Sequence, residues 1–85
     1  MAKYKIVIKK SAAKELDKLP KKELKLVSNK IKDLASEPRP VGCEKLSGQD
    51  RYRIRQGNYR VIYSIDDIVR VVAVVKIAHR REVYR

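Results

Sequence analysis

The sequence predicts an α+β fold: an N-terminal strand, a hairpin of two helices, and an antiparallel sheet of about four strands that the helices cover on one face. An alternating, β-branched run near the start indicates the first strand. Apolar residues then recur at helical spacing as far as Leu34, and alternation returns after Arg51 between short turns. Residues 1–85 are expected to form a single domain.

The first strand is expected over residues 4–9, where lysines and apolar side chains alternate. Ser11 follows as the expected N-cap of a short helix. Pro20 either ends this helix or opens the next one, because proline lacks a backbone N–H and suits only the first turn. The apolar positions of the helix are Ala12, Ala13, Leu16 and Leu19.

The second helix is expected over residues 21–36, with its lysine-rich face in solvent. A Pro- and Gly-containing loop follows at 37–42, and a turn at 47–50. The apolar stripe of this helix has i, i+3, i+4 spacing and consists of Leu24, Val27, Ile31 and Leu34.

Three strands are expected in the last part of the chain, over residues 51–56, 59–65 and 68–77. Gly57 and Asn58 have the order that a type II′ hairpin turn requires, and two aspartates form the next tight turn. The last strand carries apolar residues on both faces and is therefore expected in the middle of the sheet. One of its faces would be Val69, Val71, Ala73, Val75 and Ile77.

The formal net charge of +12 predicts a polyanionic partner, with nucleic acid as the first candidate. The alternative is the lysine-rich, solvated surface of a thermophilic protein. Residues 1–50 contain twelve Lys and one Arg, whereas residues 51–85 contain one Lys and eight Arg. Because arginine binds phosphate through a planar fork, the second half is predicted to handle phosphate.

Composition also argues against several protein classes. No apolar run approaches the roughly 20 residues of a membrane span, and the N-terminal residues do not resemble a signal peptide. The single cysteine, Cys43, excludes an internal disulfide and a zinc site built on paired cysteines, and it fits a reducing cytosol. We expect a cytoplasmic protein that uses no metal or cofactor and does not associate with membranes.

Strand parity places the arginines together. A two-residue turn at Gly57 and Asn58 would pair Arg55 with Arg60, on the same face as Arg51 and Arg53. Paired like charges destabilise a sheet by up to about 1 kcal/mol, so an external anion is expected between them. The alternative is that both side chains splay into solvent. The other face, Tyr52, Ile54, Tyr59, Val61 and Tyr63, is expected to pack on the helices.

The tail after the last strand contains the only histidine, His79, followed by Arg80, Arg81 and Tyr84. Cleavage of RNA requires a base for the ribose 2′-hydroxyl, cations for the phosphorane and an acid for the departing oxygen. His79 has an unperturbed pKa near 7, whereas Tyr84 needs neighbouring cations to favour its phenolate. The alternatives are an ordinary loop histidine and a tail tyrosine that docks on the core.

Four stretches together resemble the RelE toxins of the RelE/ParE superfamily, and the order of helices and strands matches as well. The Arg-plus-Tyr tail resembles the RNA-cleaving branch rather than the gyrase-poisoning ParE branch. The matching stretches are Lys-Leu-Ser-Gly at 45–48, Tyr-Arg-Ile-Arg at 52–55, Gly-Asn-Tyr-Arg-Val-Ile-Tyr at 57–63 and His-Arg-Arg-Glu-Val-Tyr at 79–84.

The resemblance implies a type II toxin that cuts the mRNA codon in the ribosomal A site. It implies a 2′,3′-cyclic phosphate and a 5′-hydroxyl as products, without a metal. It also implies a RelB-type antitoxin that blocks the toxin, contact with rRNA, and binding of operator DNA only through the toxin–antitoxin complex.

Residue roles follow from the same resemblance. Tyr84 matches the proposed general base, and Arg60 and Arg80 match the arginines that stabilise the transition state. Arg53 and Arg55 stand where the family has a basic pair that is often lysine. Since arginine does not readily release a proton, these two would act only electrostatically. Further RNA or phosphate contacts are expected from Lys45, Arg51, His79 and Arg81.

Some alternatives stay open at this point. Either Arg80 or Arg81 could hold the catalytic arginine position, and His79 could share the acid–base chemistry. A ParE-like inhibitor of DNA gyrase without nuclease activity is the main rival function. A basic nucleic-acid-binding module without toxicity is the second.

Overall fold

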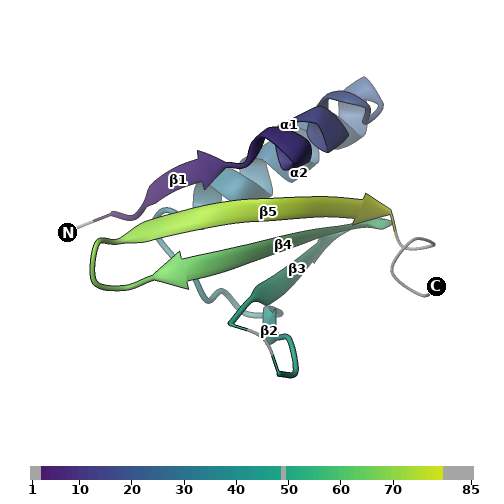
Figure 1. Ribbon diagram of the computed structural model, residues 1–85. Coiled ribbons are helices and arrows are strands. Elements are labelled where there is room, and N and C mark those ends of the chain that lie inside the picture. Colours follow the sequence, from purple (N-terminus) through teal and green to yellow (C-terminus); the bar gives the residue numbers. More distant parts are fainter. Residues whose placement is uncertain (1–2, 49, 80–85) are drawn as a thin grey trace.

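The computed structural model describes residues 3–48 and 50–79. Figure 1 shows two helices on one side of a strongly twisted sheet, above β5 in this view, with the N-terminal strand leading directly into the first helix. In chain order the elements are β1 (Lys5–Ile8), α1 (Lys10–Asp17), α2 (Lys21–Asp33), β2 (Glu44–Lys45), β3 (Tyr52–Gln56), β4 (Tyr59–Asp66) and β5 (Val71–His79).

Within these residues the strands form one five-stranded sheet in the order β1-β5-β4-β3-β2. β1 runs parallel to β5, with Lys5 opposite Val71 and Ile8 opposite Val74, and the other pairs are antiparallel. The α+β class and the strand–helix–helix–sheet order are confirmed. The sheet is mixed rather than purely antiparallel because the N-terminal strand joins its edge parallel to β5.

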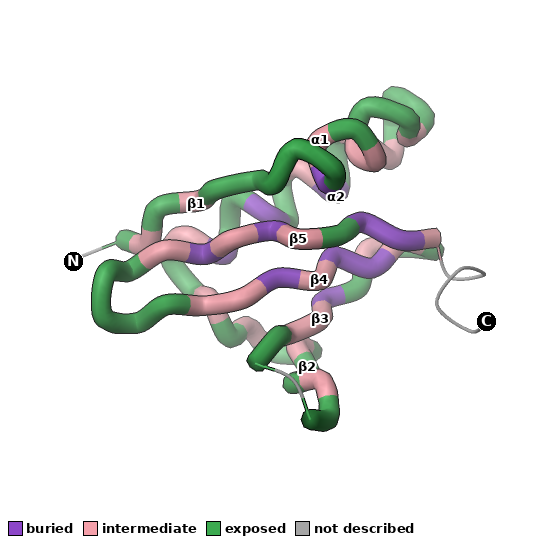
Figure 2. The backbone as a smooth tube through the Cα atoms, in the orientation of Figure 1, coloured by how far each residue is buried: buried purple, intermediate pink, exposed green. Residues whose placement is uncertain are grey.

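The helices cover one face of the sheet and enclose the core between them and the strands. The stripe predicted for α2 is confirmed at Val27, Ile31 and Leu34, which are at most 3% exposed. Full burial of one such side chain stabilises the fold by roughly 1.5–3 kcal/mol. Figure 2 shows buried positions along β4 and β5 interspersed with half-buried and exposed ones. The sheet contributes Ile54, Val61, Tyr63, Val72, Val74 and Ile77 to the core.

The start of α1 and the end of α2 differ from the sequence prediction. α1 begins at Lys10 with the extended residue Lys9 as its N-cap, so Ser11 lies inside the first turn and caps nothing. The reason is that β1 ends only two residues earlier and the chain must turn at once. Pro20 is the N-cap of α2, which ends at Asp33 rather than at residue 36.

The last strand begins later than expected and contains a bulge. A four-residue turn precedes it, in which the Asp66 carboxylate accepts hydrogen bonds from the N–H groups of Ile68 and Val69. The register then shifts between Ile62 and Tyr63, which leaves Val75 as an extra residue. The expected face of alternate residues from Val69 to Ile77 is therefore wrong: Val72, Val74 and Ile77 supply the helix-facing core.

β5 lies between β1 and β4, as its apolar character on both faces predicted. In the described part of the chain, neither helix is long and apolar enough to cross a membrane.

Candidate nucleic-acid interface

The β3–β4 hairpin arranges three arginines on the sheet surface that the helices leave uncovered. The structure pairs Arg55 with Arg60 and Arg53 with Ile62, as the two-residue turn predicted. Ile54 and Val61 pair on the opposite, helix-facing side and are buried. We call the surface formed by Arg53, Arg55 and Arg60 the arginine face.

Arg60 is held within the fold. Its exposed fraction is 3%, and it takes part in interactions with the rest of the chain. Across the sheet its register partner in β5 is the small, fully buried Ala78. The alternative in which both paired arginines splay into solvent is therefore wrong for Arg60, whereas Arg55 is exposed. Because guanidinium keeps its proton in proteins, Arg60 supplies a fixed, buried positive charge.

Arg53 has an acidic partner that strand parity could not show. The two-residue strand β2 pairs antiparallel with β3 and places Glu44 opposite Arg53. The Glu44 carboxylate accepts a hydrogen bond from the Arg53 guanidinium and forms an ion pair with it. The Arg53 side chain is 20% exposed and the Glu44 side chain 62%, so the acid lies on the solvent side of the arginine.

Of the two residues expected to add RNA contacts here, Lys45 lies on the other side of the sheet from the arginines. Lys45 pairs with Tyr52 and so shares the helix-facing side, one position away from the arginine face. Arg51 is exposed just before β3, and its carbonyl accepts a hydrogen bond from the N–H of Leu46. This bond closes the turn that contains Ser47 and Gly48.

His79 ends β5 on the helix-facing side of the sheet. It pairs with Tyr59, and the two rings meet edge to face with centroids 5.2 Å apart and an interplanar angle of 88°. The structure therefore does not bring His79 together with the three arginines. A cavity of about 390 Å³ lies beside it, lined by Glu15, Lys18, Leu19, Tyr59, Ile77 and His79.

Glu15 on α1 fixes the end of β5. β1 has already left the sheet at this level, so the edge of β5 is open. The Glu15 carboxylate fills it by accepting hydrogen bonds from the N–H of Ile77 and from Nζ of Lys76, both at 3.0 Å. Helix α1 thereby positions the strand end that lies next to Arg60.

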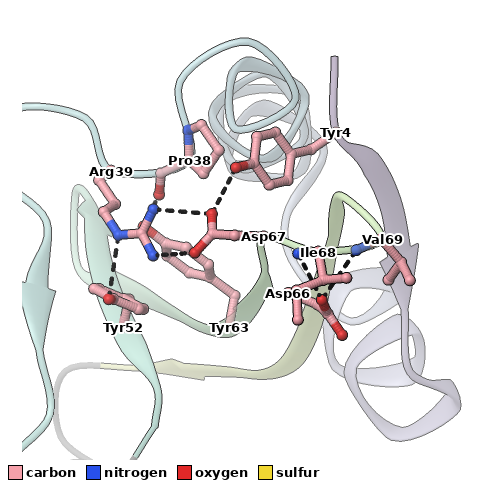
Figure 3. Close-up of polar contacts among 9 residues, drawn as sticks. All are labelled: Tyr4, Pro38, Arg39, Tyr52, Tyr63, Asp66, Asp67, Ile68 and Val69. Atoms are coloured by element: carbon pink, nitrogen blue, oxygen red, sulfur yellow. Dashed lines mark hydrogen bonds and ion pairs between the residues drawn. The ribbon is translucent and has the colours of Figure 1, made fainter. Parts of the chain in front are cut away.

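A second polar cluster joins the loop after α2 to the β4–β5 turn and to the residue that precedes β1 (Figure 3). Two Arg39 nitrogens bind the Asp67 carboxylate, at 2.9 and 3.3 Å, and Nε of Arg39 donates to the hydroxyl of Tyr52 at 3.2 Å. The hydroxyl of Tyr4 also donates to Asp67, at 2.6 Å. Hydrogen bonds from Arg39 and then from Tyr4 hold the pKa of Asp67 below its ordinary value.

Tyr63 extends this cluster into the core. Its hydroxyl donates to the carbonyl of Pro38 at 2.7 Å, while its ring stacks on Tyr52 with centroids 5.9 Å apart. Burial raises the pKa of Tyr63 well above its ordinary value, so the side chain is a neutral donor at physiological pH. The sequence signal for the cluster was Arg39, the single arginine of the first fifty residues, but nothing in the pattern named its partners.

Three predicted site residues, Arg80, Arg81 and Tyr84, lie outside the described residues. Among residues 3–48 and 50–79, no group of three or more His, Cys, Asp or Glu side chains could hold a metal ion. Cys43 is a half-buried thiol.

Comparison with known proteins places this geometry among toxins. Residues 6–84 match the family model for the ParE toxin of the type II toxin–antitoxin system parDE. Toxin RelG of Mycobacterium tuberculosis is 35% identical over 79 residues, which cover 88% of each chain. Putative toxin RelE1 of Methanocaldococcus jannaschii is 34% identical over 89 residues, which cover 98% of this chain and 97% of that protein.

Solved structures agree with these relatives. The toxin in the RelBE2 toxin–antitoxin complex of M. tuberculosis superposes with a TM-score of 0.82 at 30% identity, covering 92% of this chain and 99% of that one. The archaeal RelE–RelB complex of Pyrococcus horikoshii OT3 contains a chain with a TM-score of 0.82 at 35% identity, covering 91% and 94%.

Proposed function

Because the chain belongs to the RelE/ParE family of type II toxins, we propose that it is a ribosome-dependent endoribonuclease that cuts mRNA at the A-site codon. The observation that carries the proposal is the arginine face. It combines a buried, fixed charge at Arg60 with the exposed fork of Arg55, a combination suited to holding a phosphate. The relatives described above at 34–35% identity are named RelE or RelG rather than ParE, which favours RNA over gyrase as the target.

In the proposed reaction a base removes the proton of the ribose 2′-hydroxyl, and the 2′-oxygen attacks the adjacent phosphorus. The bond to the 5′-oxygen breaks and that oxygen takes a proton, so the products are a 2′,3′-cyclic phosphate and a 5′-hydroxyl. Tyr84 is the proposed base. Arg60 and Arg80 stabilise the charge of the phosphorane, as positioned cations do in other phosphoryl reactions. Arg53 and Arg55 hold the phosphate electrostatically.

The remaining basic residues are proposed to contact RNA away from the scissile phosphate. Lys45 and His79 lie on the helix-facing side of the sheet. Neighbouring mRNA or rRNA would therefore contact them by passing around the edge of the sheet. Arg51 and Arg81 would add backbone contacts. Neither a metal nor another cofactor enters the proposed mechanism.

The proposed partner is a RelB-type antitoxin, because several related structures are complexes of RelE with RelB. The antitoxin would block the toxin and carry operator binding for the pair. Such a system acts in the cytoplasm, where translating ribosomes are found.

The test adds the purified protein to translating ribosomes and maps the mRNA 5′ ends. We expect cuts within the A-site codon for the wild type, and a loss of roughly 10²-fold or more for a Tyr84→Phe/Arg80→Ala double variant. Absence of cuts together with gyrase-dependent DNA breaks would instead establish a ParE-like inhibitor. Equal growth after induction of both proteins, each expressed and folded, would indicate a binding module without toxicity.

Removal of the tail separates catalysis from antitoxin binding. β5 includes His79, so a chain cut after His79 retains every described strand. We expect this variant to lose cleavage while it still binds the antitoxin, measured by calorimetry with the purified partner. Retained cleavage would place the acid–base groups elsewhere in the chain.

A further inference from the structure

Glu44 bonds the guanidinium of Arg53, the group that is proposed to hold an RNA phosphate. The β2–β3 register puts it directly across from Arg53, and its carboxylate bonds the guanidinium. Carboxylate and phosphate oxygens use the same arginine fork with the same geometry. The contact on Arg53 is therefore occupied within the protein itself.

We propose that Glu44 is an internal substitute for the RNA phosphate, one that masks Arg53 in the free toxin and must move aside when RNA binds. This proposal deepens the proposed function, since it rests on Arg53 being an RNA-backbone contact. Glu44 thereby sets the affinity of the arginine face without taking part in the chemistry.

The geometry permits such a displacement. The Glu44 side chain is 62% exposed and Arg53 only 20%, so the carboxylate can rotate into water while the guanidinium stays against the sheet. β2 has two residues and is the last strand of the sheet order, so few backbone bonds restrain it. Exposed ion pairs are weak, and a phosphate therefore competes effectively with the acid.

A second acid of the sheet, Asp66, is engaged differently. Asp66 occupies the far end of β4, and its carboxylate accepts hydrogen bonds from the turn N–H groups of Ile68 and Val69. It contributes to the turn rather than to the arginines. Because Glu44 bonds the guanidinium of Arg53 directly, its removal should unmask that arginine.

The experiment measures equilibrium binding of a short single-stranded RNA, 2′-O-methylated so that it resists cleavage, by fluorescence anisotropy at low salt. We expect Glu44→Gln to bind about two- to fivefold more tightly than the wild type, because the competing carboxylate is gone. Arg53→Gln should bind more weakly. The double variant should match Arg53→Gln alone, because Glu44 acts only through that arginine.

A matched control separates this local effect from the change in net charge. Glu37 is an exposed acid in the loop after α2, and Glu37→Gln removes the same charge. An equal gain for Glu37→Gln would overturn the proposal, as would unchanged or weaker binding by Glu44→Gln, or a gain that persists without Arg53. The melting temperatures of all variants should lie within a few degrees of the wild type, because the Glu44 side chain of the ion pair is largely exposed.

The two proposals can fail separately. Cleavage of A-site codons by the wild type, together with unchanged RNA affinity in Glu44→Gln, would refute the role of Glu44 alone. Tighter RNA binding by Glu44→Gln, without any cleavage on ribosomes, would refute the proposed endoribonuclease activity. It would still support the masking of Arg53 by Glu44.

Discussion

At the scale of single residues, burial separates the two paired arginines. Arg55 is exposed and free to follow a ligand, whereas Arg60 is 3% exposed and cannot move far. A buried cation costs free energy to desolvate, and it is most useful where a charge develops in a fixed place. This difference supports distinct proposed roles, in which Arg55 holds the phosphate and Arg60 stabilises the transition state.

Conservative exchanges test this difference. Arg60→Lys keeps the charge but removes the planar fork, and we expect cleavage on ribosomes to slow by roughly 10²-fold. The matched variant Arg55→Lys should slow it less than about fivefold, because an exposed lysine can still reach the phosphate. Equal losses in single-turnover cleavage would contradict the distinction.

Asp67 makes stability depend on pH in the acid range. Hydrogen bonds from Arg39 and Tyr4 lower the pKa of Asp67 in the folded state, so the fold favours the carboxylate. This contribution is fully present above the unfolded-state pKa of about 3.9 and is lost as pH falls through the lower, folded-state pKa. The advantage of the wild type over Asp67→Asn should therefore shrink below about pH 4.

Urea unfolding at several pH values measures this effect. Asp17→Asn serves as control, since Asp17 is an exposed acid on α1. The difference in unfolding midpoint between wild type and Asp67→Asn is compared from pH 6 to pH 3. A constant difference would show that the charge of the Asp67 carboxylate does not contribute to stability.

At the scale of elements, helix α1 and strand β5 depend on one side chain. Glu15 satisfies the Ile77 N–H at the point where β1 no longer pairs with β5. An unsatisfied buried donor costs about 1–3 kcal/mol. The helix therefore replaces a strand along the last part of the sheet edge, close to the proposed site.

Substitution of Glu15 should loosen this strand end. We expect Glu15→Ala to lower the free energy of unfolding by about 1–2 kcal/mol and to speed amide hydrogen exchange at Ile77 by about tenfold. Glu15→Gln retains an acceptor and should remain close to the wild type. Unchanged exchange at Ile77 in the alanine variant would show that this hydrogen bond does not restrain the strand.

At the scale of the whole molecule, charge is distributed by residue type. Lysines dominate the first fifty residues, which include both helices, while arginines dominate the second half, where Arg53, Arg55 and Arg60 lie in β3 and β4. The helices thus carry solvated charge, and the sheet surface that the helices leave uncovered carries the arginines that are proposed to bind phosphate. The net charge of +12 favours rapid approach to a polyanion such as the ribosome.

The salt dependence of RNA binding reports how many arginines contact phosphate. Each contact to single-stranded nucleic acid lowers the logarithm of affinity by roughly 0.7 per logarithm of salt concentration. Contacts from all three arginines of the face predict a slope of about −2, or about a 20-fold loss between 50 and 200 mM salt. A slope near zero in anisotropy titrations would mean that the face does not bind the RNA backbone.

The sequence by itself determined the parts of the fold that depend on local order. The two-residue turn at Gly57 and Asn58 set the pairing of Arg55 with Arg60, because a short turn leaves a hairpin only one register. The apolar spacing of α2 determined its buried face in the same way. The resemblance to RelE toxins, carried by contiguous motifs, was confirmed by related proteins.

Only the tertiary structure decided which distant residues meet. The pairing of Glu44 with Arg53 comes from a strand of two residues, too short to show any alternation. His79 stands on the side of Tyr59, and the bulge at Val75 reverses the faces of β5 between its two halves. These features arise from pairing between separate strands and from helices packed on them, and such long-range contacts leave no period in the chain.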